Sequence, residues 1–286
     1  GSSGLRYSDQ KDDLDASKHY LELSNREQAM LDRVTADYEN VILIVNAANT
    51  MELGFVEDYS QIKSVIWCPG TGQSGFNSLG KILNGEVNPS AKTSDTFVRD
   101  LTATPTYNNF GNFTYDNMDE FAVDGVNPNF VNYTDGIYVG YRFYETAAEE
   151  GFLNYEEAVQ YPFGYGLSYT QFKQEMGELT VNNGTISVDV TVTNTGSVAG
   201  KDVVEVYYNP PYTNGGIEKA SVSLAGFAKT QMLEPGASET VTVTFTEEDM
   251  ASYDDKNAKA YVLEAGDYEI SLRTDSHTVV DTKTYT

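Results

Sequence analysis

The sequence predicts an α/β region, a partial and mostly parallel sheet with flanking helices, followed by an all-β sandwich of the immunoglobulin type. In the first part, β-branched runs alternate with helical patterns, which is the βαβ order of a parallel sheet. After about residue 175, apolar and polar side chains alternate with a period of two, as in half-buried strands. The length of 286 residues and a hydrophobic content of 40% are enough for two cores. We therefore expect one domain over residues 1–175 and a second over 176–286.

The first regular element predicted is a helix over about 24–39. Ser24 and Glu27 have the spacing of a capping box, in which two side chains satisfy free amides at a helix start. The next run, VILIV at 41–45, is too short for a helix and apolar on both faces, which is typical of a strand in a covered parallel sheet. A short helix, a second buried strand and a further helix are expected over 51–59, 64–68 and 76–83.

Residues from about 100 to 160 are rich in Tyr, Phe and Asn and show little periodicity. We predict a long loop region here, and loops of this length are usually functional or packed over another element. The structural interpretation is a surface loop held together by aromatic contacts. The functional interpretation is a sugar-contacting rim, since Tyr and Phe faces stack on the C–H faces of pyranose rings and Asn amides match pairs of hydroxyls.

Nearly every segment after residue 179 has strand character. Ile186, Val188, Val190 and Val192 alternate with polar residues, and turn signals such as Asn-Thr-Gly and Glu-Pro-Gly separate the strands. Further strands are expected over 203–207, 224–229, 241–245, 261–263 and 268–272. About seven short strands in roughly 110 residues are typical of an immunoglobulin-like sandwich. Because the chain has one cysteine, this sandwich must be held by its core alone.

Composition excludes several classes of function. The net charge of −25 would repel phosphate, so we expect no nucleic-acid partner. Cys68, the single cysteine, and two histidines, His19 and His277, are too few for a zinc or histidine-based site, and we expect no metal and no cofactor. No apolar run approaches the roughly 18 residues of a membrane helix, and the first residues do not predict a signal peptide. An acidic run is expected to be solvated: Asp9, Asp12, Asp13 and Asp15.

One literal motif lies at residues 70–75. The sequence GTGQSG matches the G-x-G-x-x-G pattern of dinucleotide-binding loops, follows a predicted strand and opens a helix, and Asp95 lies about 20 residues later. The context argues against nucleotide binding, because the acidic residue should end a strand and a turn-rich connection precedes Asp95. The motif also follows the second predicted strand instead of the first. We therefore interpret these glycines as packing a helix tightly on a strand.

Several stretches together resemble one enzyme family. Residues 65–75 and 80–97 carry a Trp, spaced glycines and the turn NPSAK, with Ala91 where the family has Gly. IYVGYRFYE at 137–145 and YPFGYGLSYTQF at 161–172 match two further motifs, and the second is the most specific match. The sandwich contributes shorter matches at 192–196, 224–227, 233–236 and 266–268. In this order the motifs resemble those of glycoside hydrolase family 3, and they span most of the chain.

The resemblance implies the C-terminal part of a β-glucosidase-like enzyme: the later part of its α/β sandwich domain and a fibronectin type III-like domain. The family consists of retaining exo-glycosidases, which need two carboxyl groups about 5 Å apart. Its nucleophile is an Asp on a TIM barrel, which this chain is too short to hold, and its acid/base Glu falls near Ser3. No catalytic or substrate-binding residue is therefore assigned, and the chain alone is expected to be inactive. The implied partners are a glycoside or oligosaccharide substrate and the missing TIM-barrel portion.

Some alternatives stay open. Residues 1–4 (GSSG) read either as an added linker or as a loop of a longer protein. Trp67 is either a core anchor or part of the family's active-site floor. A function from a different class, a non-catalytic carbohydrate-binding or adhesion module, agrees with the Tyr/Asn-rich stretch and the sandwich. For the sandwich itself, we favour the role of a scaffold that supports the α/β part.

Overall fold

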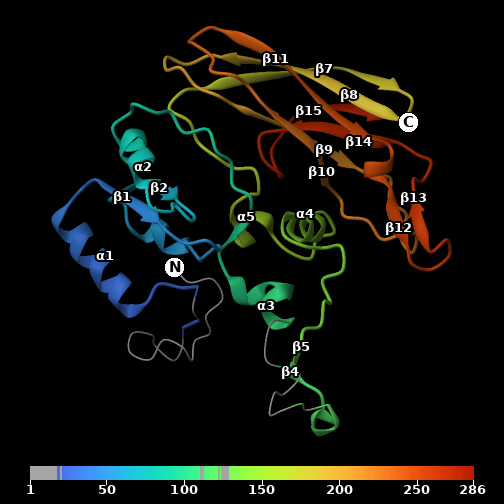
Figure 1. Ribbon diagram of the computed structural model, residues 1–286, viewed down its shortest axis with the longest axis horizontal. Coiled ribbons are helices and arrows are strands. Elements are labelled where there is room, and N and C mark those ends of the chain that lie inside the picture. The colour runs from blue at the N-terminus through green and yellow to red at the C-terminus, as the bar shows by residue number, and fades with distance from the viewer. Residues whose placement is uncertain (1–17, 20, 110–112, 122, 124–128) are drawn as a thin grey trace.

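The computed structural model describes residues 18–19, 21–109, 113–121, 123 and 129–286. Figure 1 shows an α/β part with the first helices, a β-sandwich with most of the strands, and an arm around β4 and β5 that projects from the body. Among the described residues, no helix combines the length and the apolar character needed to cross a membrane.

The first helix, α1 (Asn25–Asp37), begins at the predicted capping box. The Glu27 amide donates to Ser24 Oγ at 3.3 Å, and the Ser24 amide donates to Glu27 Oε2 at 2.8 Å. Leu31 and Thr35 form its buried face. The predicted start is confirmed, and the helix ends at Asp37 instead of residue 39.

The two predicted strands, β1 (Val41–Val45) and β2 (Ile62–Trp67), pair in parallel. A 3-10 helix, η2 (Gly54–Asp58), stands where a short helix was expected, and α2 (Phe76–Leu83) follows β2 as predicted. The predicted cover on both faces is wrong, since Val45 is buried but Ile42 is 49% exposed. Within the described part of the chain this sheet has two strands, and α2, which follows them, has no buried residue, so one face of β1 stays open.

A small core lies beside these strands. Val45, Leu53 and Phe97 are buried, and Trp67 packs edge-on against Phe97 with ring centroids 5.2 Å apart. The indole N–H of Trp67 donates to the carbonyl of Ala47 at 2.8 Å. These contacts support the interpretation of Trp67 as a core anchor.

The region from 100 to 160 contains more regular structure than the predicted loop. The helix α4 (Tyr141–Glu149) buries Tyr144, Glu145 and Ala147, so the loop prediction is wrong there. Tyr, Glu and Ala do not form an aliphatic stripe, which hid the helical period. The other elements are short: η3 (Leu101–Ala103), α3 (Pro105–Asn109), β4 (Phe113–Thr114), η4 (Met118–Glu120), β5 (Asn129–Phe130), α5 (Tyr155–Ala158) and β6 (Val159–Tyr161), which pairs with β3 (Phe97–Val98).

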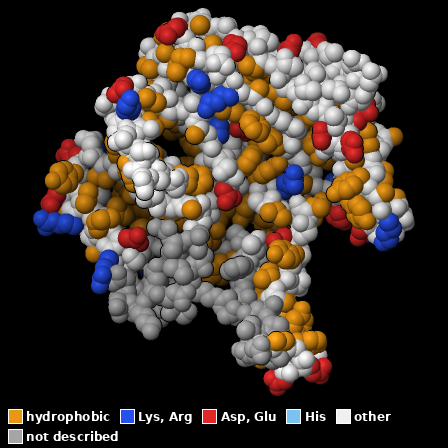
Figure 2. Space-filling view, in the orientation of Figure 1, with side chains coloured by type: hydrophobic (Ala, Val, Ile, Leu, Met, Phe, Trp, Pro, Cys, Tyr) orange, Lys and Arg blue, Asp and Glu red, His pale blue; other side chains and the backbone are white. Residues whose placement is uncertain are grey.

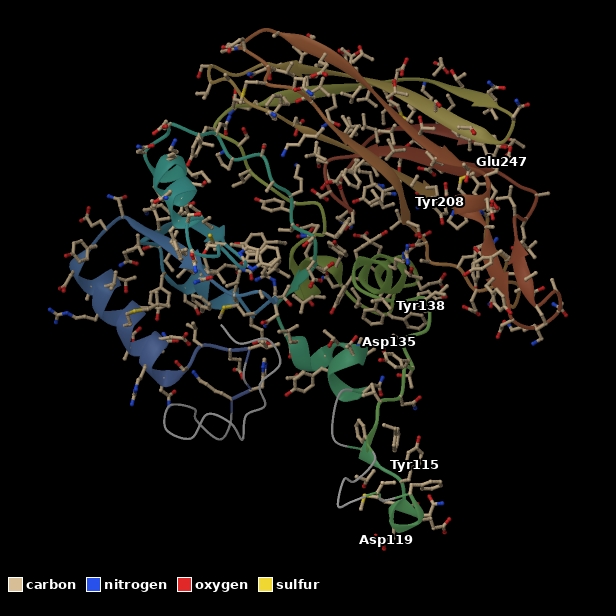
Figure 3. All side chains as sticks on the ribbon, viewed as in Figure 1. Tyr115, Asp119, Asp135, Tyr138, Tyr208 and Glu247 are labelled. Atoms are coloured by element: carbon tan, nitrogen blue, oxygen red, sulfur yellow. The ribbon has the colours of Figure 1, made fainter. Side chains whose placement is uncertain are left out.

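The arm comprises the described residues of 113–133. Its strands β4 and β5 are antiparallel, and the rings of Tyr115 and Phe130 lie 4.7 Å apart between centroids. Figure 3 places Tyr115 and Asp119 toward its far end and Asp135 at its base. Figure 2 shows hydrophobic side chains along the arm and acidic ones at its tip. The exposed large side chains are Phe113, Tyr115, Phe121, Val123, Val131 and Tyr133.

The predicted all-β sandwich is present as two antiparallel sheets. One has the strand order β11–β8–β7 and the other β10–β9–β14–β15. A separate hairpin of β12 and β13 follows the short helix η5. The bounds are β7 (Phe172–Asn182), β8 (Thr185–Asn194), β9 (Val203–Asn209), β10 (Ser223–Lys229), β11 (Ser238–Thr246), η5 (Glu248–Met250), β12 (Ser252–Asp254), β13 (Ala260–Val262), β14 (Tyr268–Arg273) and β15 (Val279–Tyr285). Sequence reasoning missed β12, β15 and the first half of β7.

The sandwich core follows the predicted alternation. The four apolar residues of β8, from Ile186 to Val192, are fully buried, and their polar neighbours face outward. Residues from the opposite sheet pack against them with no exposed surface: Val204, Val206, Ile270 and Leu272. A complete core therefore forms without any disulfide, because Cys68 is a free cysteine in the α/β part.

Candidate functional site

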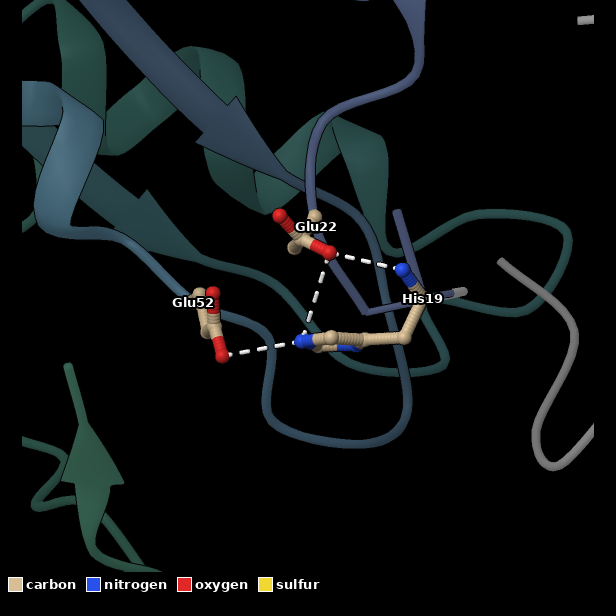
Figure 4. A group of neighbouring side chains, drawn as sticks. All are labelled: His19, Glu22 and Glu52. Carbon is tan, nitrogen blue, oxygen red and sulfur yellow. Dashed lines mark hydrogen bonds and ion pairs between the residues drawn. The ribbon is translucent and has the colours of Figure 1, made fainter. Parts of the chain in front are cut away.

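Three titratable side chains gather where the segment before α1 meets the connection after β1 (Figure 4). His19 Nε2 lies 2.9 Å from Glu52 Oε1 and 3.5 Å from Glu22 Oε2. Glu52 follows a parallel strand, and the ends of such strands are the side of an α/β sheet where ligands usually bind. This histidine–glutamate cluster is therefore the first candidate for a functional site.

Hydrogen bonds account for the positions of all three side chains without a metal ion. The Leu21 amide donates to His19 Nδ1 at 3.2 Å, so the ring proton is on Nε2, which donates to Glu52. A metal ion at this point would have to displace this proton and break the bond to Glu52. The carboxylate oxygens are also occupied, because Glu22 Oε2 accepts from the His19 amide at 2.6 Å and Glu52 Oε1 accepts from the Leu101 amide at 2.7 Å.

The cluster does not fit a pair of catalytic carboxylates either. The facing oxygens of Glu22 and Glu52 lie within 4.8 Å, near the spacing of about 5 Å that retaining hydrolysis uses. The edge of the His19 ring lies between them and bonds to Glu52, so it occupies the space that an anomeric carbon would need. We conclude that His19 ties the segment before α1 to the connection after β1, and that Glu52 ties this connection to the start of η3.

Ser3, which lies near the expected position of the acid/base Glu, is not among the described residues. The rest of residues 1–4 and the acidic run from Asp9 to Asp15 also lie outside the described residues. The position of the family's acid/base Glu near Ser3 and the solvated state of the acidic run therefore stay expectations.

The glycine-rich segment 70–75 forms a tight turn. Gly70 and Gly72 have φ of +57° and +61°, and a Cβ on Gly75 would collide with the Thr71 carbonyl. The predicted reason for these glycines, helix packing on a strand, is therefore wrong, since the constraint is local. Asp95 lies before β3 and accepts from the Thr96 amide at 2.8 Å, and burial raises the pKa of its carboxyl. It does not end a strand, which agrees with rejecting the nucleotide motif.

The most specific sequence motifs meet at the junction between the α/β part and the sandwich. Thr93 exchanges backbone hydrogen bonds of 2.8 Å with Gly164 and Tyr165. Asn88 Oδ1 accepts from Ser168 Oγ at 3.0 Å and from the Tyr169 amide at 2.8 Å. These contacts join the NPSAK turn to the PFGYGLSY segment.

The same asparagine also reaches the sandwich. Asn88 Nδ2 donates to the carbonyl of Ala199, which precedes β9, at 3.1 Å. Sequence reasoning quoted Asn88 as part of a family motif but gave it no role. Its position shows that the motif holds three segments of the chain together.

Two family models match the chain. The model described as the glycosyl hydrolase family 3 C-terminal domain matches residues 4–141, and the fibronectin type III-like domain matches residues 202–276. The chain belongs to glycosyl hydrolase family 3. The junction described above therefore joins a family 3 C-terminal domain to its fibronectin type III-like neighbour.

Relatives within family 3 cover nearly the whole chain. It is 35% identical to a β-glucosidase of Ruminococcus albus over 93% of this chain and 26% of the relative, and 37% identical to β-glucosidase A of Butyrivibrio fibrisolvens over 88% of this chain and 30% of the relative. The structure of β-glucosidase 3B from Thermotoga neapolitana in complex with glycerol matches with a TM-score of 0.77 and 31% identity, over 93% of this chain and 34% of that chain. The chain thus spans about a quarter to a third of the length of these proteins.

Proposed function

We propose that this chain is the C-terminal portion of a β-glucosidase-like retaining exo-glycosidase and that it does not hydrolyse glycosides by itself. Its membership of family 3 and the printed names of its relatives support the glycosidase class. The chain supplies the α/β part and the sandwich, and a TIM-barrel portion supplies the nucleophile. The substrate is a neutral glycoside or oligosaccharide, which a surface with a net charge of −25 does not repel.

The observation that carries the proposal of inactivity is the geometry of the histidine–glutamate cluster. Retaining hydrolysis requires one carboxylate to attack the anomeric carbon and one carboxyl group to protonate the leaving oxygen. Glu22 and Glu52 come close to the required spacing, but His19 lies between them. Without room for a sugar ring, these carboxylates hold the fold together and perform no catalysis.

A chromogenic β-glucoside tests this proposal. We expect no release of p-nitrophenol from p-nitrophenyl β-D-glucopyranoside by the purified chain, and turnover once the barrel portion of the same protein is added. The double variant Glu22→Gln, Glu52→Gln is the control. In a preparation free of host glucosidase, any turnover by the unmodified chain would overturn the proposal, and its loss in the double variant would assign it to Glu22 and Glu52.

The second candidate is a non-catalytic carbohydrate-binding or adhesion module. The exposed aromatic side chains of the arm favour it, since Tyr133 is 85% and Tyr115 50% exposed, and such rings stack on neutral sugars. Calorimetry with glucose, cellobiose and xylobiose at millimolar concentration distinguishes this candidate. Heat that is lost in Tyr115→Ala and Tyr133→Ala but kept in Tyr261→Ala, on the distant β12–β13 hairpin, would establish binding by the arm. The absence of heat in the unmodified chain would exclude it.

A further inference from the structure

The turn between β14 and β15 inserts into the α/β part. The Ser276 amide donates to the carbonyl of Phe163 at 2.8 Å, and Ser276 Oγ donates to Glu145 Oε1 at 3.0 Å. His277 Nδ1 lies 2.9 Å from Glu145 Oε2, and its ring stacks on Tyr155 with centroids 3.7 Å apart and planes 6° apart. The turn therefore contacts α4, α5 and the connection that leads into the sandwich.

His277 can gain or lose a proton while it stays in contact with Glu145. The Glu145 side chain is only 7% exposed, whereas that of His277 is 40% exposed, so solvent can deliver or remove a proton there. The hydrogen bond to Glu145 raises the pKa of His277, despite the opposing effect of partial burial. Asp275 on the same turn and Glu156 on α5 act in the same direction, and Arg273 on β14 also faces Glu145.

A second titratable group lies on the sandwich side of the contact. Glu205, on β9, is 4% exposed and packs directly against Gly164, where no Cβ would fit. Tyr207 donates its hydroxyl to Glu205 Oε2 at 2.7 Å. Burial raises the pKa of Glu205 to about 7. The other charged groups that face it are Lys92, Asp202 and Asp275, with Arg273 opposite it on β14.

We propose that the contact between the sandwich and the α/β part depends on pH. The docked state is favoured in weak acid, and the open state becomes more populated as the pH rises through neutrality. The contact, here named the docking interface, consists of Glu145, Phe163, Gly164, Glu205, Ser276 and His277. In acid, a neutral Glu205 lies against Gly164 and a cationic His277 faces Glu145. In alkali, Glu205 becomes a buried anion, and Glu145 loses its cationic partner.

Both groups act in the same direction. Each has a pKa in the docked state above its value in the open state, so each stabilises docking at low pH, and this contribution is lost as the pH rises through the docked-state pKa. For Glu205, a pKa of about 7 against an ordinary value of 4.5 makes opening about tenfold more favourable at pH 8 than at pH 6. His277 adds to this change above its ordinary value of 6.5.

Hydrogen exchange of the Ser276 amide measures the opening, because this amide bonds to Phe163 across the docking interface. Exchange of the peptide 274–279 is followed by mass spectrometry from pH 5.5 to 8.5 and corrected for the intrinsic pH dependence of amide exchange. The peptide 186–192 in the sandwich core is the internal reference. We expect protection of the turn to fall at least tenfold between pH 6 and pH 8, with no matching change in the reference peptide.

Two variants and one control assign the effect. Glu205→Gln removes the buried charge with little change in shape, and we expect it to remove most of the pH dependence and to increase protection at pH 8. Glu145→Gln keeps an acceptor for His277 but removes the charge that favours its protonated form, so the slope becomes shallower. Glu175→Gln changes an exposed residue of β7, in the other sheet, and should follow the unmodified chain.

The outcomes separate clearly. A protection factor of the turn that stays constant across this pH range would overturn the proposal. So would an unchanged slope in Glu205→Gln, provided that its reference peptide shows a folded core. If Glu205→Gln does not fold, a slope in Glu145→Gln equal to that of the unmodified chain would count against the role of the His277 pair, and a shallower slope would support it.

Discussion

The sandwich and the α/β part differ in how many partners their strands have and in how deeply their side chains are buried. In the sandwich, β8 lies between β11 and β7, β9 lies between β10 and β14, and the core side chains of both sheets are buried. In the α/β part, β1 and β2 have each other as partners within the described residues, and α2 has no buried residue. Consecutive antiparallel strands can form a core from segments that are close in sequence. A parallel pair needs covering segments from more distant parts of the sequence.

The largest expected loss of stability comes from comparing the same type of substitution, Ile to Ala, in the two parts. Ile186→Ala, in the sandwich core, should lower the free energy of unfolding by about 3 kcal/mol, because it leaves a cavity in a fully buried site. Ile42→Ala, on the half-exposed β1, should cost about 1 kcal/mol or less. Urea denaturation followed by circular dichroism measures both. Equal losses would mean that β1 is as enclosed as β8.

A smaller effect is expected at the junction. Asn88→Ala removes three hydrogen bonds that join the NPSAK turn, the PFGYGLSY segment and the sandwich, and should cost about 2 kcal/mol. The matched control is Asn77→Ala on the exposed surface of α2, which should change stability by no more than about 0.5 kcal/mol. Thermal unfolding of both variants gives the comparison. If Asn88→Ala matches its control, the junction does not depend on this side chain.

The smallest effect is expected at the start of α1. Ser24→Ala removes the capping oxygen and should cost about 1 kcal/mol. If the two parts unfold in separate steps, calorimetry should show the loss only in the transition of the α/β part. Ser78→Ala, at an exposed interior position of α2, removes no cap and serves as control. A loss in the sandwich transition would show that the two parts unfold as one unit.

Local signals account for most of what the sequence predicted correctly. The capping box at Ser24, the β-branched run of β1 and the alternation from Ile186 to Val192 each depend on residues a few positions apart. They gave the right element at nearly the right place. The helix α4 was missed because its buried face mixes Tyr144, Glu145 and Ala147. The period is present there, but the residue types that usually mark it are not.

The candidate sites depend on contacts that no local pattern contains. His277 and Glu145 are 132 positions apart, and the residues of the histidine–glutamate cluster come from two separate segments. Their pairing follows from the way the parts pack, so the sequence alone could only list them as two histidines among many acidic residues. The family motifs include the segments that form the junction. The hydrogen bonds of Asn88 between these segments are seen only in the structure.

The wide spacing of the junction contacts also bears on the order in which the chain folds. The strands β7 and β8 are joined by the two-residue turn of Asn183 and Gly184, both with positive φ, so they can pair as soon as they exist. The junction bonds close loops of 111 residues for Asn88 with Ala199 and 182 residues for Lys92 with Thr274. Because long loops close slowly, the sandwich should fold first, and the α/β part should then dock on it.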